Sequence, residues 1–334
     1  MPSPIVLVTT PEFLRAEATF RSAENLRCVE APSAEADLAA AIAGTGARYV
    51  VVGSTRYQKE LYAALPPGGV IARFGVGWDS LDLGQATAAG LICTNTPDVL
   101  QTSVAELTMS LVLDAARHLT ALDHGMRHDD WAPRTGTELR GKTLAIIGCG
   151  HIGRAVARIA SAGFGMRVVG CRRAGSVSAL GSMPEFAVVT DDIEVAVGRA
   201  DFVSLHIPGT AANIQFINRA RLAVFEEHAW LINTSRGSVV DEAALYDALA
   251  GGQLAGAALD VFAREPYVPV SADKDLRTLS CVILTPHVGS NTVDANRRMA
   301  ERALGNILFA EAREIYRMDI LNRDVIVQRM GERQ

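Results

Sequence analysis

The chain has 334 residues, of which 49% are hydrophobic and 21% are charged, and its formal net charge is -5. These values are typical of a globular protein with a large buried core, and the length predicts about two domains. Because nucleic-acid binding usually depends on a basic surface, the negative charge argues against such a partner.

The N-terminus and the cysteines predict a cytoplasmic protein. The first apolar run covers only residues 5–8 and has no basic residue before it, unlike a signal peptide. No stretch is long and apolar enough to span a bilayer, so we expect no membrane partner. The five cysteines are scattered and show no CxxC spacing. We therefore expect neither disulfides nor a metal site.

The first hundred residues alternate short apolar runs with alanine-rich helical segments. Helices are predicted between the strands, for example at 34–43 and 82–89. The predicted strands cover 5–9, 27–30, 49–52, 70–74 and 91–94. This alternation predicts a parallel sheet covered by helices on both faces.

A long amphipathic helix is predicted at 103–117, because apolar residues recur there on one helical face. A polar, irregular stretch is expected at 124–141, and a last long helix at about 293–312. Between them the strand–helix alternation resumes, with strands predicted at 143–147, 167–171, 202–206, 230–233, 257–261 and 282–284. The chain therefore has two α/β halves, with a boundary near residue 103. The pattern alone leaves open which half the last helix joins.

A glycine-rich turn follows the first strand of the second half. The segment 148–153 reads GCGHIG, the GxGxxG pattern of dinucleotide-binding turns. Gly148 would permit the tight turn, Gly150 would let the backbone approach a pyrophosphate, and Gly153 would let helix and strand pack closely. The anion would lie at the helix N-terminus, where free N–H groups favour negative charge. We assign these glycines to the cofactor site, together with His151 and Ile152.

Two residues of this turn need separate interpretation. His151 either contacts the cofactor or is a solvent-facing turn residue. Cys149 lies near a helix N-terminus, which is expected to lower the pKa of its thiol, although no catalytic task follows from that.

The next predicted strand ends in two arginines instead of an acid. An NAD site usually carries Asp or Glu there, which accepts hydrogen bonds from the ribose 2′-OH. Arg172 occupies this place and Arg173 follows it. A guanidinium binds a 2′-phosphate and stacks on adenine, whereas a carboxylate would repel the phosphate. The sequence therefore favours NADP, with NAD as the alternative cofactor. The other interpretation is that both arginines are solvated surface residues.

Three later motifs place an arginine, an acid and a histidine after predicted strands. They read NTSRG at 233–237, DVFAREP at 260–266 and TPHVG at 285–289. Ligands of open α/β sheets bind at the carboxyl ends of the strands. We therefore expect Arg236, Glu265 and His287 around one crevice beside the cofactor.

Reduction of a ketone requires this set of groups. Histidine can donate the proton near neutral pH, and a neighbouring carboxylate favours its charged form. Arginine can bind a substrate carboxylate and polarise the carbonyl. Singly, each residue is more often structural, and it is their shared placement that indicates catalysis.

Together, the motifs resemble the D-isomer-specific 2-hydroxyacid dehydrogenase family. The matching segments are RFGVGWDSLD at 73–82, NTPDVLQTSVAE at 95–106, GKTLAIIGCGHIG at 141–153, LHIPGT at 205–210, NTSRGSVVDE at 233–242, ALDVFAREP at 258–266 and TPHVGS at 285–290. The resemblance implies an NAD(P)-dependent oxidoreductase that reduces a small 2-keto acid, such as glyoxylate or hydroxypyruvate, to a D-2-hydroxy acid.

The resemblance also implies residue roles. Arg236 would orient the keto acid, and His287, paired with Glu265, would be the general acid. The backbone N–H groups of one loop would grip the substrate carboxylate, namely those of Gly75, Val76 and Gly77. Asp260 would lie near the nicotinamide, His206 and Pro208 would line the adenosine side, and Thr234 is assigned to the same cofactor site.

The implied architecture has two Rossmann-like or flavodoxin-like domains with parallel sheets and an active site in the interdomain cleft. Residues 1–102 plus 291–334 would form a discontinuous substrate-binding domain. Residues 103–290 would form the dinucleotide-binding domain, through which a homodimer would be built.

The sequence leaves open the effect of Gly209, the role of Trp78 and two alternative functions. Gly209 replaces the leucine usual in the family, and Trp78 either shapes the substrate pocket or packs on the flank of its loop. A 3-phosphoglycerate dehydrogenase is the enzymatic alternative, because Arg73 matches a position that is basic in some of those enzymes. A non-catalytic, dinucleotide-sensing corepressor is the alternative from another class.

Overall fold

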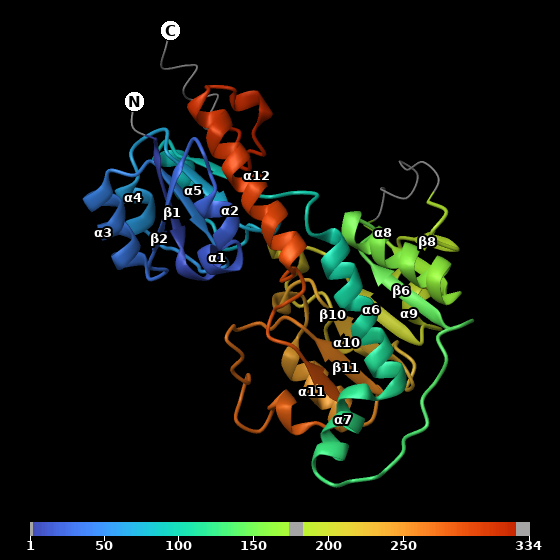
Figure 1. Cartoon of the computed structure of the whole chain (residues 1–334). Helices are drawn as coiled ribbons and strands as arrows, with labels where there is room; N and C mark the ends of the chain where they lie inside the picture. Colours follow the sequence, from blue (N-terminus) through green and yellow to red (C-terminus); the bar gives the residue numbers. More distant parts are fainter. Residues whose placement is uncertain (1–2, 174–182, 325–334) are drawn as a thin grey trace. The chain divides into compact units, whose positions relative to one another are not determined.

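The computed structural model describes residues 3–173 and 183–324, which fall into two compact units (Figure 1). Unit 1 comprises 1–100 and 290–334, and unit 2 comprises 101–289. Of the range that we assigned to the substrate-binding domain, residues 1–2 and 325–334 lie outside the described residues.

Unit 1 is built on a five-stranded parallel sheet. Its strand order is β2-β1-β3-β4-β5, which is the flavodoxin-like order. The strands are β1 (Ile5–Thr9), β2 (Arg27–Ala31), β3 (Tyr49–Val52), β4 (Val70–Arg73) and β5 (Ile92–Thr94). All five pair in parallel, as the alternation of strands and helices predicts.

Helices cover both faces of this sheet (Figure 1). One core joins the strands to α3 (Glu35–Thr45), α4 (Glu60–Ala64) and α5 (Leu83–Ala88). The C-terminal helix α12 (Val293–Glu311) contacts β4 and also packs on α1 (Thr10–Arg15) and α2 (Glu17–Arg21). Its buried stripe includes Met299, Ala303 and Ile307. The last long helix therefore belongs to the unit formed by the first hundred residues.

Unit 2 is built on a seven-stranded parallel sheet with the order β12-β11-β10-β9-β6-β7-β8. Six of these strands follow the dinucleotide-binding order, which reverses between β6 and β9, and β12 extends the sheet. The strands are β6 (Thr143–Ile147), β7 (Arg167–Cys171), β8 (Val188–Thr190), β9 (Phe202–Leu205), β10 (Trp230–Asn233), β11 (Gly256–Leu259) and β12 (Val282–Leu284).

Two separate cores cover the faces of this sheet. One contains residues of α6 (Gln101–Arg117), α8 (His151–Arg158) and the π-helical turn Ile159–Gly163. The other contains residues of α9 (Ile193–Val197), α10 (Arg219–Leu222) and α11 (Glu242–Ala250). The two-layered helical cover leaves the carboxyl ends of the strands as the edge where loops can carry functional side chains.

Two expectations about unit 2 were wrong. The stretch 124–141 is not irregular throughout, because α7 (Leu119–Arg127) extends into it. This helix buries none of its residues, and its apolar side chains Leu119 and Met126 face solvent. The strand β8 was not predicted, since its three residues are at most half-buried and form a sheet edge. No helix among the described residues is long and apolar enough to cross a membrane.

Candidate active site

The predicted residues of unit 2 gather at the carboxyl edge of its sheet. Gly148 follows β6, Arg172 follows β7 and His206 follows β9. Arg236, Asp260 and His287 come after the next three strands. Because all seven strands are parallel, these positions share one edge of the sheet.

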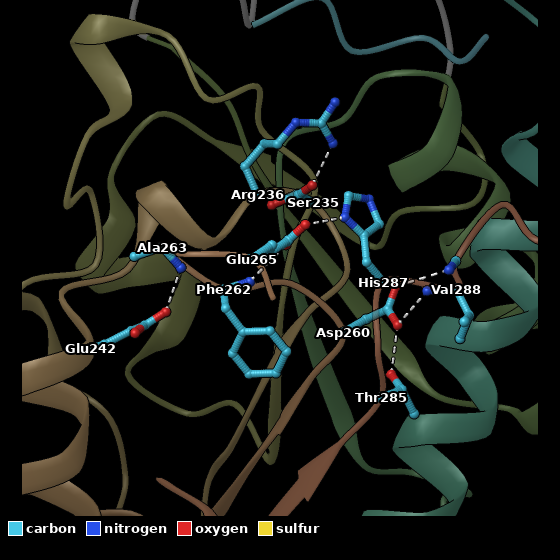
Figure 2. A network of polar contacts seen from close by, with 11 residues as sticks. Ser235, Arg236, Glu242, Asp260, Phe262, Ala263, Glu265, Thr285, His287 and Val288 are labelled. Atoms are coloured by element: carbon cyan, nitrogen blue, oxygen red, sulfur yellow. Dashed lines mark hydrogen bonds and ion pairs between the residues drawn. The ribbon is translucent and has the colours of Figure 1, made fainter. Parts of the chain in front are cut away.

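His287 and Glu265 form a close pair at this edge (Figure 2). His287 Nδ1 lies 2.6 Å from Glu265 Oε2, and the two side chains are 35% and 32% exposed. With Nδ1 engaged by the carboxylate, Nε2 is the ring nitrogen available to a substrate. The geometry brings together the acid and the imidazole that the sequence motifs predict.

Glu265 is fixed at its second oxygen as well. The N–H of Phe262 donates to Glu265 Oε1 at 3.0 Å. Burial raises the pKa of Glu265, but the bonds from His287 and Phe262 and the charge of Arg236 outweigh it, so the pKa is lowered. The folded-state pKa of Glu265 lies below its ordinary value, so the ionised carboxylate stabilises the folded protein at neutral pH. This contribution to the free energy of unfolding is lost as the pH falls through the folded-state pKa.

Arg236 is held close to the exit loop of β11, residues 260–266, by a glycine. A Cβ on Gly237 would lie 1.8 Å from the carbonyl carbon of Phe262, so only glycine permits this approach. Arg236 itself donates from Nη1 to the carbonyl of Ser235 at 2.7 Å and is half-buried. Its positive charge reaches Glu265, which places the arginine in the same cluster.

Asp260 anchors the loop that carries His287. The carboxylate is fully buried and accepts hydrogen bonds from Thr285 Oγ1 at 2.6 Å, from the Val288 N–H at 2.9 Å and from the Gly289 N–H at 2.8 Å. These donors compensate the buried group. They also hold His287 at φ 52°, a conformation uncommon for a residue other than glycine.

The three glycines of the 148–153 turn are needed for two different reasons, close packing within the protein and access for a ligand. A Cβ on Gly148 would lie 2.4 Å from the carbonyl oxygen of His206, and one on Gly153 would lie 2.1 Å from the Gly148 carbonyl oxygen. Gly150 has nothing within 4 Å of its Cβ position. The protein's own packing thus requires two of the three glycines. The third leaves open backbone at the N-terminus of α8, which fits an approaching pyrophosphate.

The other residues of the turn correct one expectation. Burial raises the pKa of the Cys149 thiol to about 12, so the proposed lowering by the helix N-terminus is wrong. Its sulfur packs under Gly170, where a Cβ would lie 2.6 Å from Sγ. His151 is exposed and Ile152 is half-buried.

Arg172 fits a role in binding the cofactor. Its Nη1 is buried without a hydrogen-bond partner among the described residues, although its charge acts on nearby Cys149. A buried guanidinium nitrogen without a partner is unfavourable, and a phosphate oxygen would satisfy it. Arg173 is exposed.

The remaining cofactor candidates differ in their environment. Burial lowers the pKa of His206 to about 4, so its ring is neutral at pH 7, and Nε2 lies 2.9 Å from Ser204 Oγ. Pro208 is exposed, and its carbonyl accepts the side-chain amide of Asn213. Thr234 is buried, and its hydroxyl lies 2.9 Å from that of Thr108 on α6.

The loop predicted to bind the substrate carboxylate lies after β4 in unit 1. Gly75 has φ 137° and donates its N–H to Thr96 Oγ1 at 3.0 Å. Within the described part of the chain, the N–H groups of Val76 and Gly77 have no such acceptor. These two are therefore the loop's available donors. Trp78 is exposed in unit 1.

Glu242 and Thr285 were missed by the sequence analysis. Glu242 accepts the Ala263 N–H at 2.6 Å, and Thr285 bonds Asp260. The usable signals were their positions in two motifs, since Glu242 ends NTSRGSVVDE and Thr285 begins TPHVG. Among the described residues, no group of three or more His, Cys, Asp or Glu side chains could hold a metal ion.

Comparison with known proteins gives this site a family. Residues 109–289 match the model of the D-isomer specific 2-hydroxyacid dehydrogenase, NAD binding domain. The chain belongs to the D-isomer specific 2-hydroxyacid dehydrogenase family. It is thus an NAD(P)-dependent oxidoreductase that acts on the CH–OH group of a small 2-hydroxy acid, as the motifs predict.

Individual relatives carry two different names. The glyoxylate reductase of Thermococcus litoralis is 37% identical over 286 residues, which cover 83% of this chain and 84% of that protein. The D-3-phosphoglycerate dehydrogenase of Methanocaldococcus jannaschii is 37% identical over 273 residues, 81% of this chain but 50% of that protein.

A solved structure supports the fold. The NADPH-dependent glyoxylate/hydroxypyruvate reductase from Sinorhizobium meliloti, in complex with NADP and malonate, is similar with a TM-score of 0.75 and 32% identity. The similarity covers 92% of this chain and 93% of that one.

Substitution of the turn glycines should separate packing from cofactor binding. Gly153→Ala should lower the melting temperature of the protein without cofactor, because its methyl group meets the Gly148 carbonyl. Gly150→Ala should leave that temperature unchanged and weaken NADPH binding about tenfold or more, on the scale of 1.4 kcal/mol per tenfold. Thermal unfolding and fluorescence titration with NADPH measure the two effects. Equal behaviour of the variants would contradict the assignment.

Proposed function

We propose that this chain reduces a small 2-keto acid of the glyoxylate or hydroxypyruvate type to the D-2-hydroxy acid. The observation that carries the proposal is the 2.6 Å contact between His287 Nδ1 and Glu265 Oε2, with Arg236 in the same cluster. The glyoxylate reductases among the relatives, at 37% identity, support the substrate class.

In this proposal a bound nicotinamide cofactor would supply the hydride for the carbonyl carbon. The side chains of the protein orient the substrate and donate the proton to the carbonyl oxygen. His287 donates a proton from Nε2 to the carbonyl oxygen. Glu265 holds the ring and stabilises its charged form. Arg236 binds the substrate carboxylate and polarises the carbonyl.

A phosphorylated substrate has less support. One relative is a D-3-phosphoglycerate dehydrogenase, and Arg73 matches a position that is basic in some of those enzymes. However, Arg73 is buried, and its Nη1 donates to the carbonyl of Phe74, directly beneath the Gly75 turn. Its guanidinium therefore supports the loop at Gly75 and is largely shielded from solvent. We propose a small unphosphorylated keto acid as the substrate.

We also propose that the protein is located in the cytoplasm.

Removal of the proton donor and of its partner tests the mechanism. His287→Ala should lower kcat for glyoxylate or hydroxypyruvate with NADPH by roughly 100-fold or more. Glu265→Gln should lower kcat, because the imidazole of His287 loses the carboxylate that holds its Nδ1 at 2.6 Å.

The exposed Glu227→Gln serves as the control, with initial rates followed at 340 nm. Wild-type rates in His287→Ala would overturn the proposed mechanism. Tight NADPH binding by the native protein without turnover of any keto acid would favour the sensing, corepressor-like function. Turnover only with 3-phosphohydroxypyruvate would favour the phosphoglycerate enzyme.

We further propose that the chain prefers NADPH, because the unsatisfied Nη1 of Arg172 lies where the ribose 2′-phosphate is expected. Arg172→Asp should reduce kcat/KM for NADPH by about 10- to 100-fold, the scale of one or two charge-assisted hydrogen bonds. The rate with NADH should change much less. Arg167→Asp, an exposed arginine at the other end of β7, is the matched control. A wild-type preference for NADH would contradict the proposal.

We also propose a homodimer built on the cofactor domain. Three large apolar side chains of the segment 119–131 face solvent in the chain alone: Leu119 is 57% exposed, Met126 55% and Trp131 83%. Exposed apolar groups gathered in one segment are typical of an interface. Trp131→Ser should shift the mass measured by light scattering from two chains toward one. Tyr316→Ser, which alters an 85% exposed aromatic residue of unit 1, should not. A monomeric wild type would disprove the dimer.

A further inference from the structure

A second carboxyl holds the exit loop that carries Glu265. Glu242 is the first residue of α11 and is only 6% exposed. Its Oε1 accepts the backbone N–H of Ala263 at 2.6 Å (Figure 2). A buried carboxylate with a short bond to a backbone N–H restrains the path of that backbone.

The peptide on which Glu242 acts is joined directly to the His287–Glu265 pair. The N–H of Phe262, one residue earlier, donates to Glu265 Oε1 at 3.0 Å. Glu265 Oε2 in turn lies 2.6 Å from His287 Nδ1. Two successive N–H groups of one loop are therefore taken by two carboxylates, one from α11 and one from the pair itself.

The loop has little room to move in other directions. The carbonyl carbon of Phe262 lies against Gly237, where a Cβ would be 1.8 Å away. A shift of the 262–263 peptide would therefore disturb Glu265 or the turn that carries Arg236. On the side of α11, the hydrogen bond from the Ala263 N–H to Glu242 restrains the same peptide.

The ionisable groups near Glu242 include Glu265 of the His287–Glu265 pair. Burial raises its pKa, the Ala263 N–H lowers it, and the charge of Glu265 raises it further. Tyr267 is also within electrostatic reach, and Asp241 precedes Glu242 as the N-cap of α11. The two carboxyls therefore interact electrostatically across the exit loop.

We propose that Glu242 is a positioning residue for the keto-acid reduction, acting through the Ala263 N–H to hold the exit loop and keep Glu265 against His287. The inference rests on the proposed function. The contact needs an acceptor oxygen at this place, and it does not need a negative charge. A glutamine should therefore replace Glu242 in this role, and an alanine should not.

Three variants test this in the full-length protein. Glu242→Ala should lower kcat for glyoxylate with NADPH about tenfold or more, with KM and the Kd for NADPH changed less than threefold. Glu242→Gln should recover most of that kcat. Asp241→Ala, which removes the N-cap bond to Ala244 on the same helix, should lower the melting temperature with kcat unchanged. The proposal fails if Glu242→Ala keeps the wild-type kcat, or if Glu242→Gln loses as much as Glu242→Ala.

A measurement without turnover separates this inference from the proposed function. Diethylpyrocarbonate modifies accessible neutral imidazoles, and mass spectrometry reads the modification of His287. Glu242→Ala should be modified several-fold faster than the wild type, because a loosened Glu265 no longer covers Nδ1 of the ring. Glu242→Gln and Asp241→Ala should match the wild type. An inactive wild type would refute the keto-acid proposal alone, whereas equal modification rates would refute the role of Glu242.

Discussion

The arrangement of the site depends on one buried carboxylate, that of Asp260. It lies at the end of β11 and accepts three hydrogen bonds from the segment 285–289 that follows β12. Two neighbouring strand ends are thereby joined by side-chain chemistry in addition to the sheet. Because the carboxylate is fully buried, losing any one donor would be costly, and the segment has a single favourable path. That path holds His287 in the left-handed conformation which places its ring at Glu265.

A second constraint operates at the level of a single peptide. The exit loop of β11 carries Glu265, and its Phe262–Ala263 peptide lies against Gly237, next to Arg236. The arginine turn, the acid and the histidine loop are therefore not three independent placements on a sheet. They share contacts, so a change in one is transmitted to the others through packed backbone and not through flexible side chains.

The fold could be predicted from the sequence wherever the pattern was set by burial. Buried parallel strands read as continuous apolar runs, so β1, β3, β6, β7 and β10 were predicted with their observed bounds. β12, a partly buried edge strand, was predicted from its apolar run alone. The short edge strand β8 and the exposed helix α7 were missed, because neither buries a stripe of side chains. Likewise, Arg236, Glu265 and His287 could be found because each lies in a motif at a strand end. Glu242 also lies in such a motif, NTSRGSVVDE, but its contact with the Ala263 N–H was not predicted, since a glutamate in the first turn of a helix is equally typical of a solvated surface.

The glycines of the 148–153 turn also differ in whether burial and packing explain them. In the 148–153 turn the sequence presents three equivalent letters, yet packing demands glycine at 148 and 153 and is indifferent at 150. A fold that bound nothing would retain the first two for its own contacts and would tolerate a side chain at the third. What distinguishes Gly150 is its place, because this open backbone lies at the N-terminus of α8, where a pyrophosphate binds most favourably. Arg172 adds an independent sign of the same kind, because its Nη1 finds no partner within the described chain. Both features are unfavourable or unexplained for the protein alone and become favourable with an anionic dinucleotide in place.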